Sequence, residues 1–196
     1  SFVTIASKGD SVDSGLNLPV DHRYAAGFGN GTRGVVAGSY YPAQTNNISY
    51  VDIATLGSSA DFGDLTETKR NTTGQSSDTN GYVSGGWIPS AYGINEIEKF
   101  PFAVDENSSD VGDLTVINSA GSGQNSTTHG VYSGGRVPPN NYSNVIEKFT
   151  FASDGNGSDV GDLLTAVASS YGQSSETHGY VSGGNDGSST NVIQKF

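Results

Sequence analysis

The eight residues Thr79-Asn80-Gly81-Tyr82-Val83-Ser84-Gly85-Gly86 decide the fold, because this segment recurs along the chain. It recurs as Thr-His-Gly-Val-Tyr-Ser-Gly-Gly at 128–135 and as Thr-His-Gly-Tyr-Val-Ser-Gly-Gly at 177–184, and a degenerate copy occupies 32–39. The first glycines of the four copies stand at positions 34, 81, 130 and 179, so successive copies are 47, 49 and 49 residues apart.

Three further markers keep the same step. Asp-x-Gly-Asp-Leu begins at 61, 110 and 159, and Gly-Gln begins at 74, 123 and 172. Ile-Glu-Lys-Phe begins at 97 and 146, and its variant Ile-Gln-Lys-Phe stands at 193–196. Four markers that hold one period indicate a repeated unit of about 49 residues.

Each unit contains four short segments typical of β-strands, which we name a to d, separated by turn residues. Strand a is the Gly-Gln stretch, for example 171–175, and strand b is the Gly-Tyr-Val-Ser run before Gly-Gly. Strand c is expected at 144–152, where alternation places Val145, Glu147, Phe149 and Phe151 on one side. Strand d is the Gly-Asp-Leu-Thr piece, and an Asp/Asn/Gly/Ser tract such as 154–158 forms the c–d turn.

A four-stranded unit of this length matches the blade of a β-propeller, for which kelch repeats of about 50 residues are typical. The Gly-Gly after strand b and the aromatic residues on strand c resemble kelch-like repeats over nearly the whole chain. The tryptophan that kelch repeats carry before strand d is missing from every unit, and the single tryptophan, Trp87, falls in a loop. The Thr-His-Gly-Tyr-Val-Ser-Gly-Gly and Ile-Glu-Lys-Phe signatures are also similar to those of kelch-like repeat virion or tail proteins of marine bacteriophages and cyanobacteria.

The predicted fold is therefore all-β, a single propeller domain over 1–196. We expect a partial blade at 1–18, blades at about 22–67, 72–116 and 121–165, and a partial blade at 170–196. Two arrangements stay open: a closed four-bladed ring, whose last blade takes strand d from the N-terminal segment, or part of a larger propeller. The start at Ser1 and the absence of methionine favour an excerpt from a longer chain.

Composition excludes several classes of function. The net charge of −11 repels phosphates, so neither nucleic acid nor an anionic membrane is an expected partner. No apolar stretch approaches the length of a membrane span. The absence of cysteine removes disulfides, thiolate metal sites and the Cys–Tyr radical cofactor that resemblance to galactose oxidase, a kelch-type enzyme, would imply. No nucleophile elbow, Walker A motif or His-Glu-x-x-His motif is present, so we expect no enzyme.

Candidate binding residues lie in the b–c loops, which differ between units while the frame repeats. In a propeller, the b–c and d–a connections emerge on one face, and variable loops on a rigid scaffold usually carry recognition. Aromatic rings beside Asn and Gln suit stacking on sugars or burial at a protein interface. The alternative is that these rings only cover blade edges. The candidate ligand-binding residues are Tyr40, Tyr41, Trp87, Tyr92, Arg136 and Tyr142.

The acidic residues gather in the c–d tracts, on the opposite face. Asp154, Asn156, Ser158 and Asp159 offer the clustered oxygens that calcium prefers, but their spacing fits no EF-hand loop. Asx turns use the same residues, so no cofactor is expected. His129 and His178 share one repeat position with Arg33 and Asn80, and we expect them to make structural hydrogen bonds.

Two functions follow as expectations. The first is a structural or recognition propeller of a phage virion or tail, which contacts other virion proteins or the host surface. The second is a lectin-like module that binds surface glycans, or in a weaker version a secreted or surface adhesin. Both place the protein on a virion or outside the cell.

Overall fold

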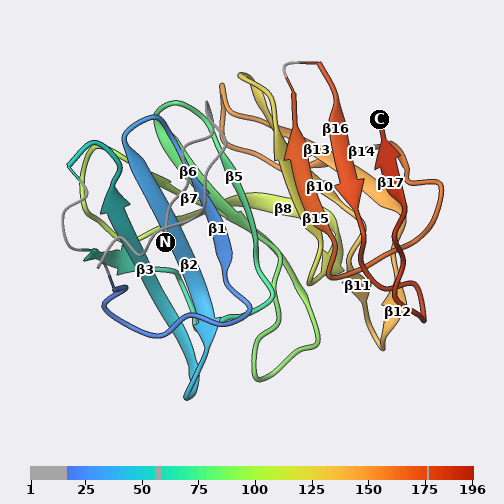
Figure 1. Cartoon of the computed structure of the whole chain (residues 1–196), viewed down its shortest axis with the longest axis horizontal. Coiled ribbons are helices and arrows are strands. Elements are labelled where there is room, and N and C mark those ends of the chain that lie inside the picture. The colour runs from blue at the N-terminus through green and yellow to red at the C-terminus, as the bar shows by residue number, and fades with distance from the viewer. Residues whose placement is uncertain (1–16, 56–58, 176) are drawn as a thin grey trace, which may run out of the picture.

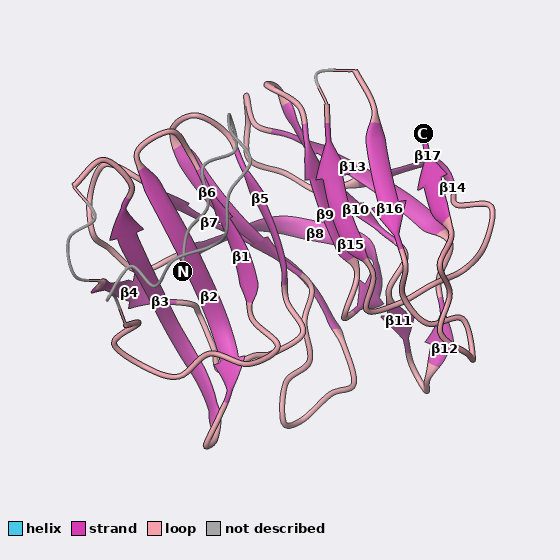
Figure 2. Cartoon of the chain, viewed as in Figure 1, coloured by secondary structure: helices cyan, strands magenta, loops and turns pink. Residues whose placement is uncertain are grey.

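The computed structural model describes residues 17–55, 59–175 and 177–196. These residues form strands, turns and loops without any helix (Figure 2). Four antiparallel sheets follow one another along the chain and are arranged as the blades of a β-propeller, from the blue blade to the red one in Figure 1. A helix that could cross a membrane is accordingly not found among the described residues.

Each blade is a sheet in which strands adjacent in sequence pair with one another. Blade 1 contains β1 (Ala26–Gly29), β2 (Arg33–Tyr40), β3 (Gln44–Asp52) and β4 (Ala60–Asp64). Blade 2 contains β5 (Thr73–Ser76), β6 (Asn80–Ser84), β7 (Ile94–Pro101) and β8 (Ser109–Asn118). Blade 3 contains β9 (Ser122–Asn125), β10 (His129–Ser133), β13 (Val145–Thr150) and β14 (Ser158–Asp162). Blade 4 contains β15 (Tyr171–Ser174), β16 (Gly179–Ser182) and β17 (Ile193–Lys195).

The structure differs from the expected strands in three places. Strand d begins about three residues earlier than the Gly-Asp-Leu-Thr piece, because the first aspartate of Asp-x-Gly-Asp-Leu and the residue before it also pair with strand c. A β-bulge on strand d leaves one residue unpaired next to the glycine of this motif; these residues are Phe62, Val111 and Val160. The b–c loop of blade 3 forms an extra hairpin of β11 (Arg136–Val137) and β12 (Asn141–Tyr142). The strand c expected at 1–6 lies outside the described residues.

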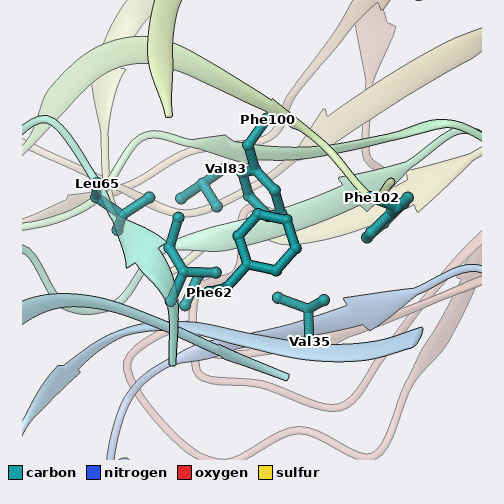
Figure 3. Packing of buried hydrophobic residues seen from close by; sticks show 8 residues of the cluster. Val35, Phe62, Leu65, Val83, Phe100 and Phe102 are labelled. Carbon is teal, nitrogen blue, oxygen red and sulfur yellow. The ribbon is translucent and has the colours of Figure 1, made fainter. Parts of the chain in front are cut away.

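The hydrophobic core is divided among the interfaces between successive blades. Between blades 1 and 2, Val35, Ile48, Phe62 and Leu65 pack against Val83, Phe100 and Phe102 (Figure 3). The next interface joins Tyr82, Ile97 and Leu114 to Tyr132 and Phe149, and the third joins Ile146, Leu163 and Val167 to Val181. At each of these interfaces, one blade packs against the blade that follows it in sequence. We call the face that a blade turns toward its successor its leading face, and the face toward its predecessor its trailing face.

Buried polar side chains also join each blade to the next. Glu98 accepts hydrogen bonds from the backbone nitrogen and the hydroxyl of Thr66, in the linker that precedes blade 2. At the equivalent position of blade 3, Glu147 accepts from the nitrogen of Thr115. In blade 4, Gln194 accepts from the nitrogen of Thr165 and donates to its carbonyl. A buried position in the third strand of blades 2 to 4 thus holds the preceding blade's last segment.

No described residue packs over the leading face of blade 4 as the next blade does in blades 1 to 3. The inner strands contact one another in the order β1, β5, β9 and β15. Thr73 and Ser122, at equivalent positions of β5 and β9, are 3% and 2% exposed, whereas Tyr171 of β15 is 75% exposed. Ile193, the equivalent of the buried Ile97 and Ile146, is 69% exposed. Among the described residues, no fifth blade covers this surface.

Candidate functional site

The linkers that lead into strand a form a rigid frame around the propeller axis. Tyr24, Asn71, Ala120 and Ser169 occupy the same place in the four linkers and share a left-handed backbone, with φ between 53° and 57°. Each is held by its neighbour, because Asn71 donates its N–H to the Tyr24 carbonyl, Ala120 to Asn71, and Ser169 to Ala120, at 2.7–2.8 Å. Left-handed backbone at residues other than glycine persists only where the surroundings enforce it. These three hydrogen bonds therefore fix the positions of the four linkers with respect to one another.

The same linkers fix the start of each b–c loop. Arg70 and Trp87 exchange two backbone hydrogen bonds, as do Ser119 with Arg136 and Ala168 with Asn185. In blade 1, Tyr40 donates its N–H to the carbonyl of Arg23. The residue at this position, three places after the last residue of the Tyr-Val-Ser run or its Val-Tyr-Ser or Val-Val-Ala equivalent, is Tyr40, Trp87, Arg136 or Asn185, and its backbone is hydrogen-bonded to a linker in every blade. The linkers therefore hold one residue of each blade at an equivalent place, and this residue differs from blade to blade.

These linkers and loops enclose a pocket of about 700 Å³, which we call the axial pocket. The linker residues Tyr24, Asn71, Ala120 and Ser169 all line it, so it lies where the four blades converge. Rings and guanidinium groups complete its wall. These side chains are those of Trp87, Tyr92, Tyr171, Arg70 and Arg136.

The tyrosine rings of the axial pocket are exposed, whereas Trp87 is half-buried. Tyr92 is 68% exposed and Tyr24 is 58% exposed. Tyr92 stands edge-on to Trp87, with ring centroids 6.4 Å apart. Its backbone carbonyl accepts a hydrogen bond from the Ser119 hydroxyl, at 3.3 Å, which ties the loop to the next linker. A ligand can therefore reach the Tyr92 ring, and the backbone that carries this ring is held in place by a hydrogen bond.

Arg70 is the best-held charged side chain of the pocket. Its guanidinium carbon lies 4.2 Å from the ring centroid of Tyr40 and 4.1 Å from that of Trp87, so the group is stacked between a ring of blade 1 and a ring of blade 2. Its Nε is buried without a hydrogen-bond partner. Stacking of this kind orients the guanidinium through its faces and uses none of its N–H groups.

Arg136 lies at the edge of the pocket, on the extra hairpin. It donates to the side-chain oxygen of Asn140 at 2.5 Å and lies 5.2 Å from the ring centroid of Tyr142. The Tyr142 hydroxyl donates in turn to the side-chain oxygen of Asn185, at 2.6 Å. Arg136 is thus held by neutral groups.

The structure brings together three of the six residues predicted from sequence. Trp87, Tyr92 and Arg136 line the axial pocket. Tyr40 and Tyr142 lie behind it, where they support Arg70 and Arg136. Tyr41 lies outside the pocket wall, with Arg23 over its ring at 5.1 Å. Sequence reasoning missed Arg70, which lies in a linker and not in a b–c loop. The signal that could have found it is variation between units, because Ser119 and Ala168 stand at the same repeat position.

The c–d tracts on the opposite face are structural turns and contacts between blades. Asp159 accepts from the nitrogen of Gly161, and Asn156 accepts from that of Asp113 in the preceding blade. Asp154 forms an ion pair with Lys99. Within the described residues, no group of three or more His, Asp or Glu side chains could hold a metal ion.

The two repeated histidines also have structural partners, as expected. Their Nδ1 atoms lie 2.8 Å from the hydroxyls of the preceding Thr128 and Thr177.

Comparison with known proteins adds no relative: neither a protein-family model nor a curated protein sequence matches the chain significantly. What can be said of function therefore depends on the axial pocket.

Proposed function

We propose that this chain is a non-enzymatic, kelch-like recognition propeller that binds surface glycans through the axial pocket. The observation that carries the proposal is the convergence of exposed rings, above all Tyr92, on a frame whose backbone is fixed by hydrogen bonds between blades. Rings of this kind stack on the apolar faces of sugars, and the neighbouring Asn and Ser side chains suit sugar hydroxyls. Because the backbone that carries these rings is already fixed, binding a ligand costs little additional conformational entropy.

In this proposal the protein acts outside the cell or on a virion, where it contacts the host surface or other particle proteins. The kelch-like repeat markers and their similarity to phage virion and tail proteins support that setting. Copurification with particles would separate a virion component from a free lectin-like protein.

The test is a glycan array probed with the wild-type protein and with Tyr92→Ala. We expect the variant to bind the best glycan at least fivefold more weakly, which corresponds to about 1 kcal/mol for a truncated contact ring. Trp87→Ala should weaken binding further, because it also removes one ring from Arg70.

Tyr41→Ala is the matched control, since Tyr41 is an exposed aromatic residue that lies outside the pocket wall. Its binding should equal that of the wild type. If no glycan binds any of these proteins, the proposed function is wrong and a purely structural propeller becomes the better account.

A further inference from the structure

The charge of the axial pocket is opposite to that of the whole protein. The chain carries 20 acidic and 9 basic residues, and its net charge is −11. The residues that line the pocket include two arginines, Arg70 and Arg136, and neither an aspartate nor a glutamate. A cationic pocket within an acidic protein attracts anions locally, while the surrounding surface repels large polyanions.

The two arginines also lack carboxylate partners, as do Arg23, Lys148 and Lys195, whereas three other basic residues of the described chain are paired. Arg33 pairs with Asp52 and Asp105, Lys69 with Glu96 and Glu98, and Lys99 with Asp154. Arg70 and Arg136, by contrast, form no ion pair with any described residue. The Nε of Arg70 is buried and has no hydrogen-bond partner at all. Within the described chain, the Arg70 guanidinium is therefore held by stacking alone, without a polar contact.

From these observations we propose that the axial pocket recognises an anionic saccharide, one that bears a carboxylate or a sulfate group. Arg70 binds the anionic group, because its planar guanidinium is oriented by Tyr40 and Trp87 and suits two parallel hydrogen bonds to such a group. Tyr92 stacks on the sugar ring, and Arg136 supplies a second positive charge at the edge. This inference rests on the proposed function and specifies the class of glycan.

A saccharide fits the pocket better than an acidic peptide. The wall offers three exposed rings, Tyr24, Tyr92 and Tyr171, but only two cations. This balance suits sugar units that each present an apolar face for stacking and carry at most one charge. The acidic total charge also disfavours a peptide with a run of carboxylates.

The experiment compares pairs of glycans that differ only in charge: sialylated with desialylated, glucuronate-containing with glucose-containing, and sulfated with unsulfated. An oligoglutamate peptide is included as a probe of the alternative ligand. We expect the acidic member of at least one pair to bind tenfold or more tightly than its neutral partner, and its affinity to fall as salt is raised.

Arg70→Gln and Arg136→Gln should each remove most of this preference while leaving the neutral glycan unaffected. The Arg70→Gln substitution also removes the group stacked between Tyr40 and Trp87, so it can disturb these rings. The Arg136→Gln variant tests the charge without this effect, because Arg136 lies on a hairpin outside the blade sheets. Arg33→Gln is the matched control, since it removes an arginine that is already paired on the other face, and it should retain the preference.

The outcomes separate the two proposals. Equal binding of acidic and neutral glycans would overturn the inference and leave the proposed function standing. Absence of binding to any glycan would overturn both. Tight binding of oligoglutamate, lost in Arg70→Gln, would show that the ligand is an acidic peptide and not a saccharide.

Discussion

Two glutamates at one repeat position have different surroundings. Glu98 is paired with the buried Lys69 and also accepts from the hydroxyl of Ser108. Glu147 is 1% exposed, and its Oε1 has no hydrogen-bond partner. The difference arises because Asn118 and Gly157 stand where Lys69 and Ser108 stand one unit earlier. Glu147 is thus a buried charge without a cation.

We predict that Glu147→Gln stabilises the protein by about 1–3 kcal/mol, since it removes an unpaired buried charge. Gln194 of blade 4 shows how an amide satisfies this position, through both the nitrogen and the carbonyl of Thr165. The urea midpoint of the variant measures the effect. The same substitution at Glu98 is the control, and it should destabilise by about 3–5 kcal/mol because Lys69 loses its buried partner. A lower midpoint for Glu147→Gln would contradict the interpretation.

Tyr132 links stability to alkaline pH. Its side chain is wholly buried, and this burial raises the pKa of its phenol well above the ordinary value of 10.0. Above pH 10 the unfolded chain loses this proton while the folded chain keeps it, so stability is full below about pH 10 and falls as the pH rises. The expected fall from this group approaches about 1.4 kcal/mol per pH unit.

The Tyr132→Phe variant tests this dependence, with melting temperatures followed from pH 8 to 11.5. The variant should be less stable at pH 8 by about 1 kcal/mol, because the phenol oxygen accepts a hydrogen bond from the nitrogen of Gly121. Its melting temperature should then decline less steeply with pH than that of the wild type. Parallel curves for the two proteins would show that Tyr132 is not the group responsible.

At the scale of the strands, the Gly-Gln marker is explained by the closeness of the inner strands. A Cβ atom on Gly123 would overlap the carbonyl oxygen of Gly74, and one on Gly172 would overlap that of Gly123. The glutamine that follows reaches the next blade, because Gln75 donates to the carbonyl of Val131 and Gln124 to that of Tyr180. In this marker, the glycine allows neighbouring inner strands to come close together, and the glutamine forms a hydrogen bond between neighbouring blades.

We predict that Gly123→Ala destabilises the protein by at least about 3 kcal/mol, since the added methyl group forces β5 and β9 apart. Gly27 occupies the same repeat position in β1, but a Cβ atom there meets nothing within 4 Å. Gly27→Ala is therefore the matched control and should leave the unfolding free energy nearly unchanged. Thermal or urea unfolding of the two variants measures the difference, and equal losses would contradict this role of the glycine.

Much of the frame could be predicted from sequence because each marker recurs in at least three units. The Gly-Gly, Gly-Gln and Gly-Asp-Leu markers correspond to positive φ angles, to close approach of neighbouring blades and to a bulge, features that recur from blade to blade. Glu98 and Glu147 repeat in sequence, but whether each is paired depends on side chains more than 20 residues away. Repetition alone could not reveal that difference.

The axial pocket was only partly predictable for the same reason. Trp87, Tyr92 and Arg136 stood out as large side chains in variable loops. Arg70 gains its importance from the rings of Tyr40 and Trp87, which come from two blades, and this arrangement exists only once the blades are assembled. Whether these residues bind a ligand stays a prediction for the experiments above.

At the scale of the whole molecule, the blades are not equally supported. Blades 2 and 3 bury both faces, whereas blade 4 buries Val181 on its trailing face and leaves Ile193 and Tyr171 exposed. Local opening is easiest where few apolar contacts must be broken. We therefore predict that backbone amides of β16 exchange with deuterium at least about tenfold faster than those of β6 and β10, which hold the equivalent places in blades 2 and 3.

Native-state hydrogen exchange followed by mass spectrometry or NMR tests this gradient, and Val181→Ala sharpens it. Val181 belongs only to the interface of blades 3 and 4, so its truncation removes packing that holds blade 4 to the rest. Exchange should then accelerate further in β15, β16 and β17 and stay unchanged in β6, which packs through other clusters. Equal acceleration in all blades would mean that the four sheets open as one cooperative unit, and the propeller would then distribute the stability of each interface over the whole molecule.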